Sequence, residues 1–91
     1  MFEFDPDKSE QNAAKHGIDF IQAQALWDTM PLSVASNQNA LEPRELMIGR
    51  IGDRIWTAIT TQRNGRIRII SVRRARPNEE QVYERSVGEE N

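Results

Sequence analysis

The one histidine of the chain, His16, follows Lys15 and precedes Gly17, and it is the first candidate for acid–base chemistry. Imidazole titrates closer to neutral pH than any other side chain, so His16 could donate or accept a proton, although a lone histidine more often caps a helix or packs. A position near the end of an expected helix favours the protonated ring, which suits a general acid. Lys15 could stabilise negative charge beside it.

Arginines supply a second kind of chemistry, and they are concentrated in one part of the chain. Residues 44–76 contain nine arginines and no lysine and carry a net charge of +7, whereas residues 1–43 carry −5 and residues 77–91 carry −4. A guanidinium group binds phosphate or carboxylate through two hydrogen bonds at once. The block therefore indicates either an anion-binding face, for a nucleic-acid backbone or an acidic partner, or a solvated face paired with the acidic flanks.

Composition excludes several classes of protein. With 91 residues, 37% of them hydrophobic, the chain has the size of one domain, and we expect that domain to span residues 1–91. The absence of cysteine excludes disulfides, a thiol nucleophile and a thiolate metal site. No metal-ligand motif occurs, so neither a metal nor another cofactor is expected. Without a long apolar run or a signal-peptide pattern, we expect a cytoplasmic protein with no membrane partner.

The first third of the chain predicts two helices. Asp5-Pro6 is typical of an N-cap followed by proline at the first helical position, and Gly17 is typical of a C-cap. Asp19 and Gln22 stand three residues apart, as in a capping box. The predicted elements are a short strand at residues 2–4, a helix over residues 6–16 and a second helix from residue 19 to before residue 31. Residues 32–35 suggest a further short strand, which we do not include in the predicted order of elements.

Beyond residue 44 the pattern predicts strands and then a last helix. Asn64-Gly65 is a strong signal for a type I′ hairpin turn, and Pro77 with acids after it is typical of a helix start. The strands are predicted over residues 45–51, 55–63 and 66–72. The fold class is therefore α+β in the order β-α-α-β-β-β-α, with two N-terminal helices and a C-terminal helix on one side of an antiparallel β-meander and a frayed tail from about residue 88.

Alternation along the last strand places its arginines. The side chains of Arg66 and Arg68 should point to one face of the sheet and the isoleucines between and after them to the other. Ile70 breaks this pattern, so either a helix covers part of the arginine face or a β-bulge resets the register near Ile70. Arg73 and Arg74 must leave the strand on opposite sides.

A wider set of residues surrounds these candidates at characteristic spacings. It comprises the motifs Phe4-Asp5-x-x-Lys8 and Asn12-x-x-Lys15-His16-Gly17-Ile18-x-Phe20, the strand Arg66-Ile67-Arg68-Ile69-Ile70-Ser71-Val72-Arg73-Arg74-Ala75, and Tyr83. Over roughly residues 2–84, this set resembles the BrnT family, the ribonuclease half of type II toxin–antitoxin pairs. The resemblance implies a RelE/ParE-like fold and metal-independent RNA cleavage that inhibits translation. It also implies a BrnA-type DNA-binding antitoxin as the partner. The toxin would then contact operator DNA only through this antitoxin.

The resemblance further implies which residues form the site. The basic catalytic residues of the family correspond to Lys15, His16, Arg63 and Arg73. The correspondence is weaker at Arg44 and Arg74. We expect these two arginines, with Arg66 and Arg68, to bind RNA. Metal-free cleavage needs a proton acceptor, a proton donor for the 5′-oxygen and cations around the phosphorane. We interpret His16 as the acid or base, and Arg63 and Arg73 as phosphate clamps.

Two positions depart from the family pattern. Thr60 stands where an aromatic or large residue is common, which removes a possible stacking surface for a base. Gln62 stands where many members carry glutamate, so a base role at that position would move to His16 or a lysine. These departures support an alternative, an attenuated toxin that only docks its antitoxin or another acidic partner. Inhibition of a topoisomerase, from the ParE side of the superfamily, is a third hypothesis.

Overall fold

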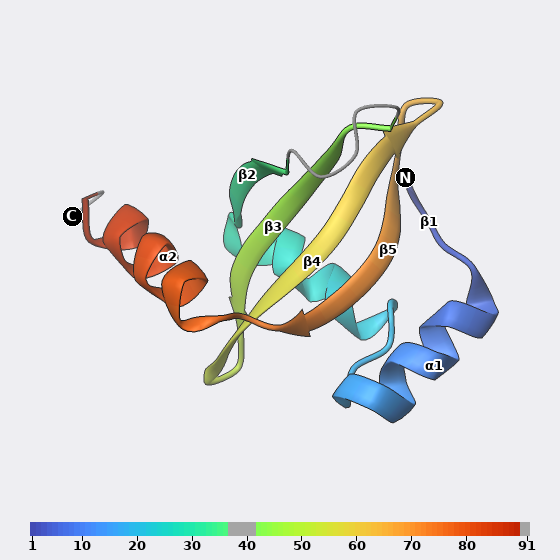
Figure 1. Cartoon of the computed structure of the whole chain (residues 1–91), viewed down its shortest axis with the longest axis horizontal. Helices are drawn as coiled ribbons and strands as arrows, with labels where there is room; N and C mark the ends of the chain where they lie inside the picture. Colours follow the sequence, from blue (N-terminus) through green and yellow to red (C-terminus); the bar gives the residue numbers. More distant parts are fainter. Residues whose placement is uncertain (37–41, 90–91) are drawn as a thin grey trace.

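The computed structural model describes residues 1–36 and 42–89 of the chain. These residues contain three helices and five strands (Figure 1). The elements are β1 (Phe2–Glu3), α1 (Pro6–His16), the 3-10 helix η1 (Gln22–Thr29), β2 (Leu32–Ser36), β3 (Arg44–Ile51), β4 (Arg54–Arg63), β5 (Arg66–Arg74) and α2 (Pro77–Glu89). The α+β class is confirmed. The predicted order was one strand short, because residues 32–36 pair with β3 as a full strand. No helix in these residues is long and apolar enough to span a membrane.

The sheet has the strand order β1-β5-β4-β3-β2, and it is mixed. β2, β3, β4 and β5 form an antiparallel meander, whereas β1 runs parallel to β5, with Glu3 opposite Arg68. The expectation of an antiparallel sheet throughout was therefore wrong. Glu3 and Arg68 lie 65 residues apart in the chain, and a local pattern carries no information about which sheet edge so short a strand will join.

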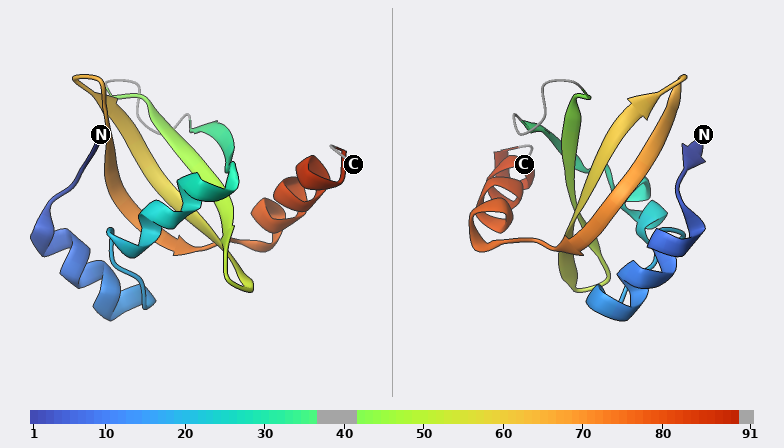
Figure 2. Two further views of the ribbon diagram at one scale, coloured as in Figure 1. Left: turned by 180° about the vertical axis from the view of Figure 1, so that it is seen from behind. Right: turned by 45° about the vertical axis from the view of Figure 1, so that its right-hand side comes forward.

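Helices cover both faces of the sheet, not one as expected (Figure 2). On one face, Leu26 of η1 belongs to a buried cluster with Trp56 of β4, and on the other, Tyr83 of α2 packs with Ile48 and Ile55. Because neighbouring residues in a strand point to opposite faces, Ile55 and Trp56 cannot be buried by the same layer. Apolar side chains on both faces of β4 therefore require helices on both sides.

Local signals set the ends of α1 and the turn between β4 and β5 as predicted, whereas η1 begins at Gln22 and not at residue 19. The Asp5 carboxylate accepts a hydrogen bond from the N–H of Asp7 at 2.9 Å, and Gly17 ends α1 with a φ of +80°. Asp19 and Gln22 exchange two capping-box hydrogen bonds, although the segment that follows is a 3-10 helix. Asn64-Gly65 has positive φ at both positions, as a type I′ turn requires.

One buried amide fastens α1 to the edge of the sheet. The side-chain amide of Asn12 donates to the carbonyl of Val72 at 2.9 Å and accepts from its N–H at 3.2 Å, and it also donates to the carbonyl of Ile18. Asn12 thus satisfies the backbone of β5 where β1 no longer pairs with it. This contact holds α1, with Lys15 and His16 in its last turn, alongside β5.

Candidate anion-binding site

A β-bulge decides which arginines share a face. The register between β4 and β5 shifts between Ile59 and Thr60, so Ile70 is the extra residue of β5, and the bulge is confirmed as the reason for the broken alternation. Cross-strand partners point to the same face, and Arg68 lies opposite Thr61 while Arg73 lies opposite Thr57. The arginines on this common face, which α2 also covers in part, are Arg44, Arg63, Arg66, Arg68 and Arg73.

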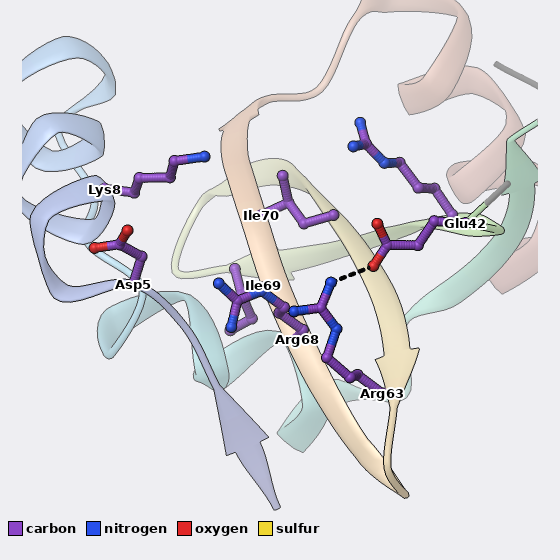
Figure 3. A pocket seen from close by; sticks show the side chains of 8 residues that line it. Asp5, Lys8, Glu42, Arg63, Arg68, Ile69 and Ile70 are labelled. Atoms are coloured by element: carbon purple, nitrogen blue, oxygen red, sulfur yellow. Dashed lines mark hydrogen bonds and ion pairs between the residues drawn. The ribbon is translucent and has the colours of Figure 1, made fainter. Parts of the chain in front are cut away.

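Three of these arginines line a hollow of about 210 Å³ together with residues of the N-terminal segment (Figure 3). In Figure 3 the ammonium of Lys8 extends from α1 toward Ile70, and the guanidinium of Arg63 points to Glu42. The lining residues are Asp5, Lys8, Glu42, Arg44, Arg63, Arg68, Ile69 and Ile70. Four cations against two carboxylates give the hollow a positive charge, which suits a bound anion.

The arginines of this hollow are held loosely. Arg63 binds Glu42 at 2.7 Å and Arg68 binds Glu3 at 2.9 Å, each through one short contact, and the Arg63 side chain is 47% exposed. An exposed pair such as Arg63–Glu42 contributes about 1 kcal/mol or less, so a phosphate can replace that carboxylate at little cost, whereas the Arg68–Glu3 pair is partly buried. The Nε–H of Arg44 is buried and has no hydrogen-bond partner among the described residues. A buried donor of this kind needs an acceptor, which an anion in the hollow would supply.

Arg73, predicted to be catalytic, is held elsewhere. Its guanidinium binds both carboxylate oxygens of Glu79, at 2.8 and 2.9 Å, and Glu79 also accepts from the hydroxyl of Thr57 and the N–H of Arg76. The hydrogen bond from Arg73, with the bonds from the Arg76 N–H and Thr57, lowers the pKa of Glu79 to about 2 against the effect of burial, and the pair raises the pKa of Arg73. In this structure Arg73 joins β5 to the start of α2.

The remaining predicted residues fall into three places. Lys15 and His16 line a shallower hollow of about 180 Å³ on the other side of Lys8 and Ile70, which line both hollows. Arg66 lies opposite Arg63 at the hairpin end, outside either hollow. Arg74 points to the opposite face, where its guanidinium lies 5.7 Å from the ring centre of Trp56. The structure therefore places Lys15 and His16 in a hollow that adjoins the one lined by Arg44, Arg63 and Arg68, and Arg74 on the other face of the sheet.

Lys8 and Glu42 line the larger hollow, and neither was among the predicted site residues. Lys8 carried a usable signal, because Lys8, Asn12 and Lys15 follow the i, i+4, i+7 spacing of one helix face, and Asn12 faces the sheet. Glu42 carried none, since an acid two residues before a strand has no characteristic spacing to the strand that it contacts.

The two departures from the family pattern lie on the other face of the sheet. Thr60 is 4% exposed and pairs with Ile69, so its side chain belongs to the face that η1 covers and offers no surface for stacking a base. Gln62 pairs with Ile67 and alternates with Arg63, so it points away from the hollow. A glutamate at position 62 of this backbone would therefore not face an anion bound between the arginines.

Comparison with known proteins places this arrangement in a family. Residues 4–79 match the family model described as the ribonuclease toxin BrnT of type II toxin–antitoxin systems. The chain belongs to this family. The crystal structure of the Brucella abortus ribonuclease toxin BrnT is similar, with a TM-score of 0.64 and 28% sequence identity over 84% of this chain and 97% of that one. No curated protein sequence matches the chain significantly.

Membership of the BrnT family confirms the resemblance inferred from the sequence motifs. A BrnT-family chain is a ribonuclease toxin of a type II toxin–antitoxin system, so RNA is its substrate class and an antitoxin its partner. The mixed sheet with helices on both faces is thus the scaffold of a ribonuclease toxin, and it carries the basic hollow beside α1.

Proposed function

We propose that this toxin is an endoribonuclease that cleaves RNA without a metal ion, by attack of a 2′-hydroxyl on the adjacent phosphorus, and so inhibits translation until a BrnA-type antitoxin binds it. The observation that carries the proposal is the basic hollow, which Arg44, Arg63 and Arg68 line together and in which the buried Nε–H of Arg44 has no partner within residues 1–36 and 42–89. Their positive charges would stabilise the phosphorane, the task that a metal ion performs elsewhere. In residues 1–36 and 42–89 no cluster of acids and histidines suits a metal.

The proposed roles follow from where each side chain lies. A phosphate held by the three arginines would extend its RNA backbone past Lys8, which borders both hollows, to Lys15 and His16. His16 is then the proton donor for the leaving 5′-oxygen, and Lys15 holds the backbone beside it. Arg66 extends the contact toward the hairpin. We assign Arg73 a positioning role, because Glu79 already binds both of its terminal nitrogens.

The test is cleavage of labelled RNA by the purified toxin in excess EDTA. We expect products with 2′,3′-cyclic phosphate and 5′-hydroxyl ends, and we expect His16→Ala to slow cleavage by about 10²–10⁴-fold. Expression without the antitoxin should arrest growth, and the His16→Ala variant should relieve the arrest while keeping the circular dichroism spectrum of the wild type. A folded protein that leaves RNA intact and growth normal would overturn the proposal.

A second candidate function is favoured by one observation. Arg63 and Arg68 already bind carboxylates, so the same face could hold an acidic segment of a partner protein without cutting RNA. A chain with this function would bind its antitoxin tightly, and it would leave growth unchanged when it is expressed alone. The growth assay therefore separates the two functions in one experiment.

A further inference from the structure

We propose that Glu42 is the general base of the cleavage reaction, the group that removes the proton from the attacking 2′-hydroxyl. This inference rests on the proposed ribonuclease function and identifies a residue for a step that His16 and the arginines leave unassigned. Metal-free cleavage needs an acceptor on the 2′ side and a donor on the 5′ side of one phosphate. His16 can serve one of these sides, so the other requires a second group.

The position of Glu42 is the first argument. Its side chain lines the hollow directly beside the arginines, and Oε1 accepts a hydrogen bond from Arg63 at 2.7 Å. Oε2 has no hydrogen-bond partner among the described residues, and the side chain is 35% exposed. Arg63 therefore orients the carboxylate through one oxygen and leaves the other oxygen open toward the space where a phosphate would lie (Figure 3). A 2′-hydroxyl next to that phosphate would come within reach of it.

The other two carboxylates near the hollow are placed differently. Asp5 also lines the hollow, but it stands at the start of α1, where its Oδ1 caps the helix by accepting from the N–H of Asp7, and among the described residues no arginine of the hollow orients it. Glu3 binds Arg68 from β1 and does not line the hollow. The charged groups that face Glu42 are Lys8 from α1 and the arginines Arg44, Arg63 and Arg68 from β3, β4 and β5, with Asp5 at the start of α1.

The reaction balances with these residues alone. The 2′-hydroxyl proton passes to the Glu42 carboxylate as the 2′-oxygen bonds to phosphorus. The bond from phosphorus to the 5′-oxygen breaks, and that oxygen takes a proton from the His16 imidazolium. The products are a 2′,3′-cyclic phosphate and a 5′-hydroxyl, and no water is consumed. Afterwards Glu42 is protonated and His16 neutral, so proton exchange with solvent restores both groups.

A competing role for Glu42 predicts the opposite result. If the carboxylate only occupies the anion site through Arg63, then removing its charge should free the arginine, strengthen RNA binding and leave cleavage equal or faster. If it is the base, then removing its charge should slow the chemical step and leave binding almost unchanged. The sign of the change in rate therefore decides between a base and an occupant.

The matched variants are Glu42→Gln and Glu45→Gln. Glu45 is the next glutamate in the chain, but it alternates to the face away from the hollow and accepts from the hydroxyl of Ser33. Single-turnover cleavage of RNA should slow by about 10²–10⁴-fold in Glu42→Gln and stay at the wild-type rate in Glu45→Gln. Binding of a 2′-O-methyl RNA, which cannot be cleaved, should be similar in both variants, and a loss of fold in Glu42→Gln would be seen by circular dichroism.

A modified substrate distinguishes the base from the acid. Sulfur in place of the 5′-oxygen at a mapped cleavage position leaves as a thiolate and needs no proton. This substrate should restore cleavage by His16→Ala and should not restore cleavage by Glu42→Gln. If Glu42→Gln cleaves ordinary RNA as fast as the wild type, or if the sulfur substrate restores it, the role of Glu42 is overturned while the ribonuclease function stands. If the folded wild type does not cleave RNA at all, both proposals fall.

Discussion

Arg63 and Arg73 lie on the same face of the sheet and each binds a glutamate, yet the two pairs differ in what they can do. Arg73 makes two short bonds to Glu79, whose side chain is 9% exposed and is held further by Thr57 and the backbone. Arg63 makes one bond to Glu42 and is 47% exposed. The guanidinium of Arg63 can therefore exchange its carboxylate for a phosphate at a lower free-energy cost than the guanidinium of Arg73 can. We call Arg73–Glu79 the α2 pair and Arg63–Glu42 the hollow pair.

The largest effect should come from breaking the α2 pair. Glu79→Ala leaves the guanidinium of Arg73 and the hydroxyl of Thr57 without an acceptor, and we expect a loss of about 3–5 kcal/mol in the free energy of unfolding. Urea denaturation followed by circular dichroism measures it. The control is Glu80→Ala, one residue further along the same helix. Equal losses in both variants would contradict the assignment of the pair as structural.

Acid should remove the stabilisation that the α2 pair gives to the folded protein. The pKa of Glu79 is about 2 in the folded protein against an ordinary value of 4.5, so the unfolded chain binds the proton more readily. The stabilisation is complete above about pH 5.5, is lost progressively as the pH falls from 4.5 through 2, and is worth about 3 kcal/mol. Unfolding free energies between pH 2 and 7 should show this decline in the wild type. A Glu79→Gln variant with the same decline would contradict it.

In the hollow the effect should be on activity and not on stability. Arg44→Ala removes a buried N–H donor that has no acceptor in the part of the chain that the structure describes. We therefore expect RNA cleavage to slow by about 10²–10³-fold and the free energy of unfolding to change by less than about 1 kcal/mol. Arg50→Ala, an exposed arginine on the same strand, is the control. Single-turnover cleavage and urea denaturation measure the two quantities. A loss of stability instead of activity would make Arg44 resemble Arg73.

The smallest effect should come from an acid that only pairs with an arginine of the hollow. Glu3→Gln frees Arg68, so we expect 2′-O-methyl RNA to bind up to about fivefold more tightly, with a change in stability below about 1 kcal/mol. Fluorescence anisotropy measures the binding, and Glu10→Gln, an exposed acid on α1, should leave it unchanged. Weaker binding in Glu3→Gln would mean that Glu3 orients Arg68 for RNA and does not compete with it.

Features that depend on a few neighbouring residues could be predicted from the sequence. Asp5, Gly17 and Asn64-Gly65 each act through backbone conformation within about one turn of the chain, and their structures agree with the predictions. The bulge at Ile70 was one of two alternatives, because alternation shows that a register breaks but not why it breaks. The BrnT resemblance also came from local motifs, and the family match confirms it.

The separation of charge along the chain could also be predicted from the sequence. The acidic partner of each arginine could not. Residue types and spacing determined an arginine-rich sheet with acidic flanks, and a histidine at the end of a helix. The structure pairs Arg68 with an acid 65 residues away and Arg63 with one 21 residues away. It leaves the Nε–H of Arg44 without a partner among the described residues.

Tertiary structure alone decided which arginines are held in a buried ion pair and which remain accessible to an anion. The reason is physical: the free energy of an ion pair depends on how far both groups are removed from water and on how many further hydrogen bonds hold them. Those quantities arise when α2 packs against β3, with Tyr83 beside Ile48 and Ile55, and when Asn12 fixes α1 beside β5, contacts that join distant parts of the chain. The sequence by itself determined the chemistry that is present, and the fold decided where that chemistry is free to act.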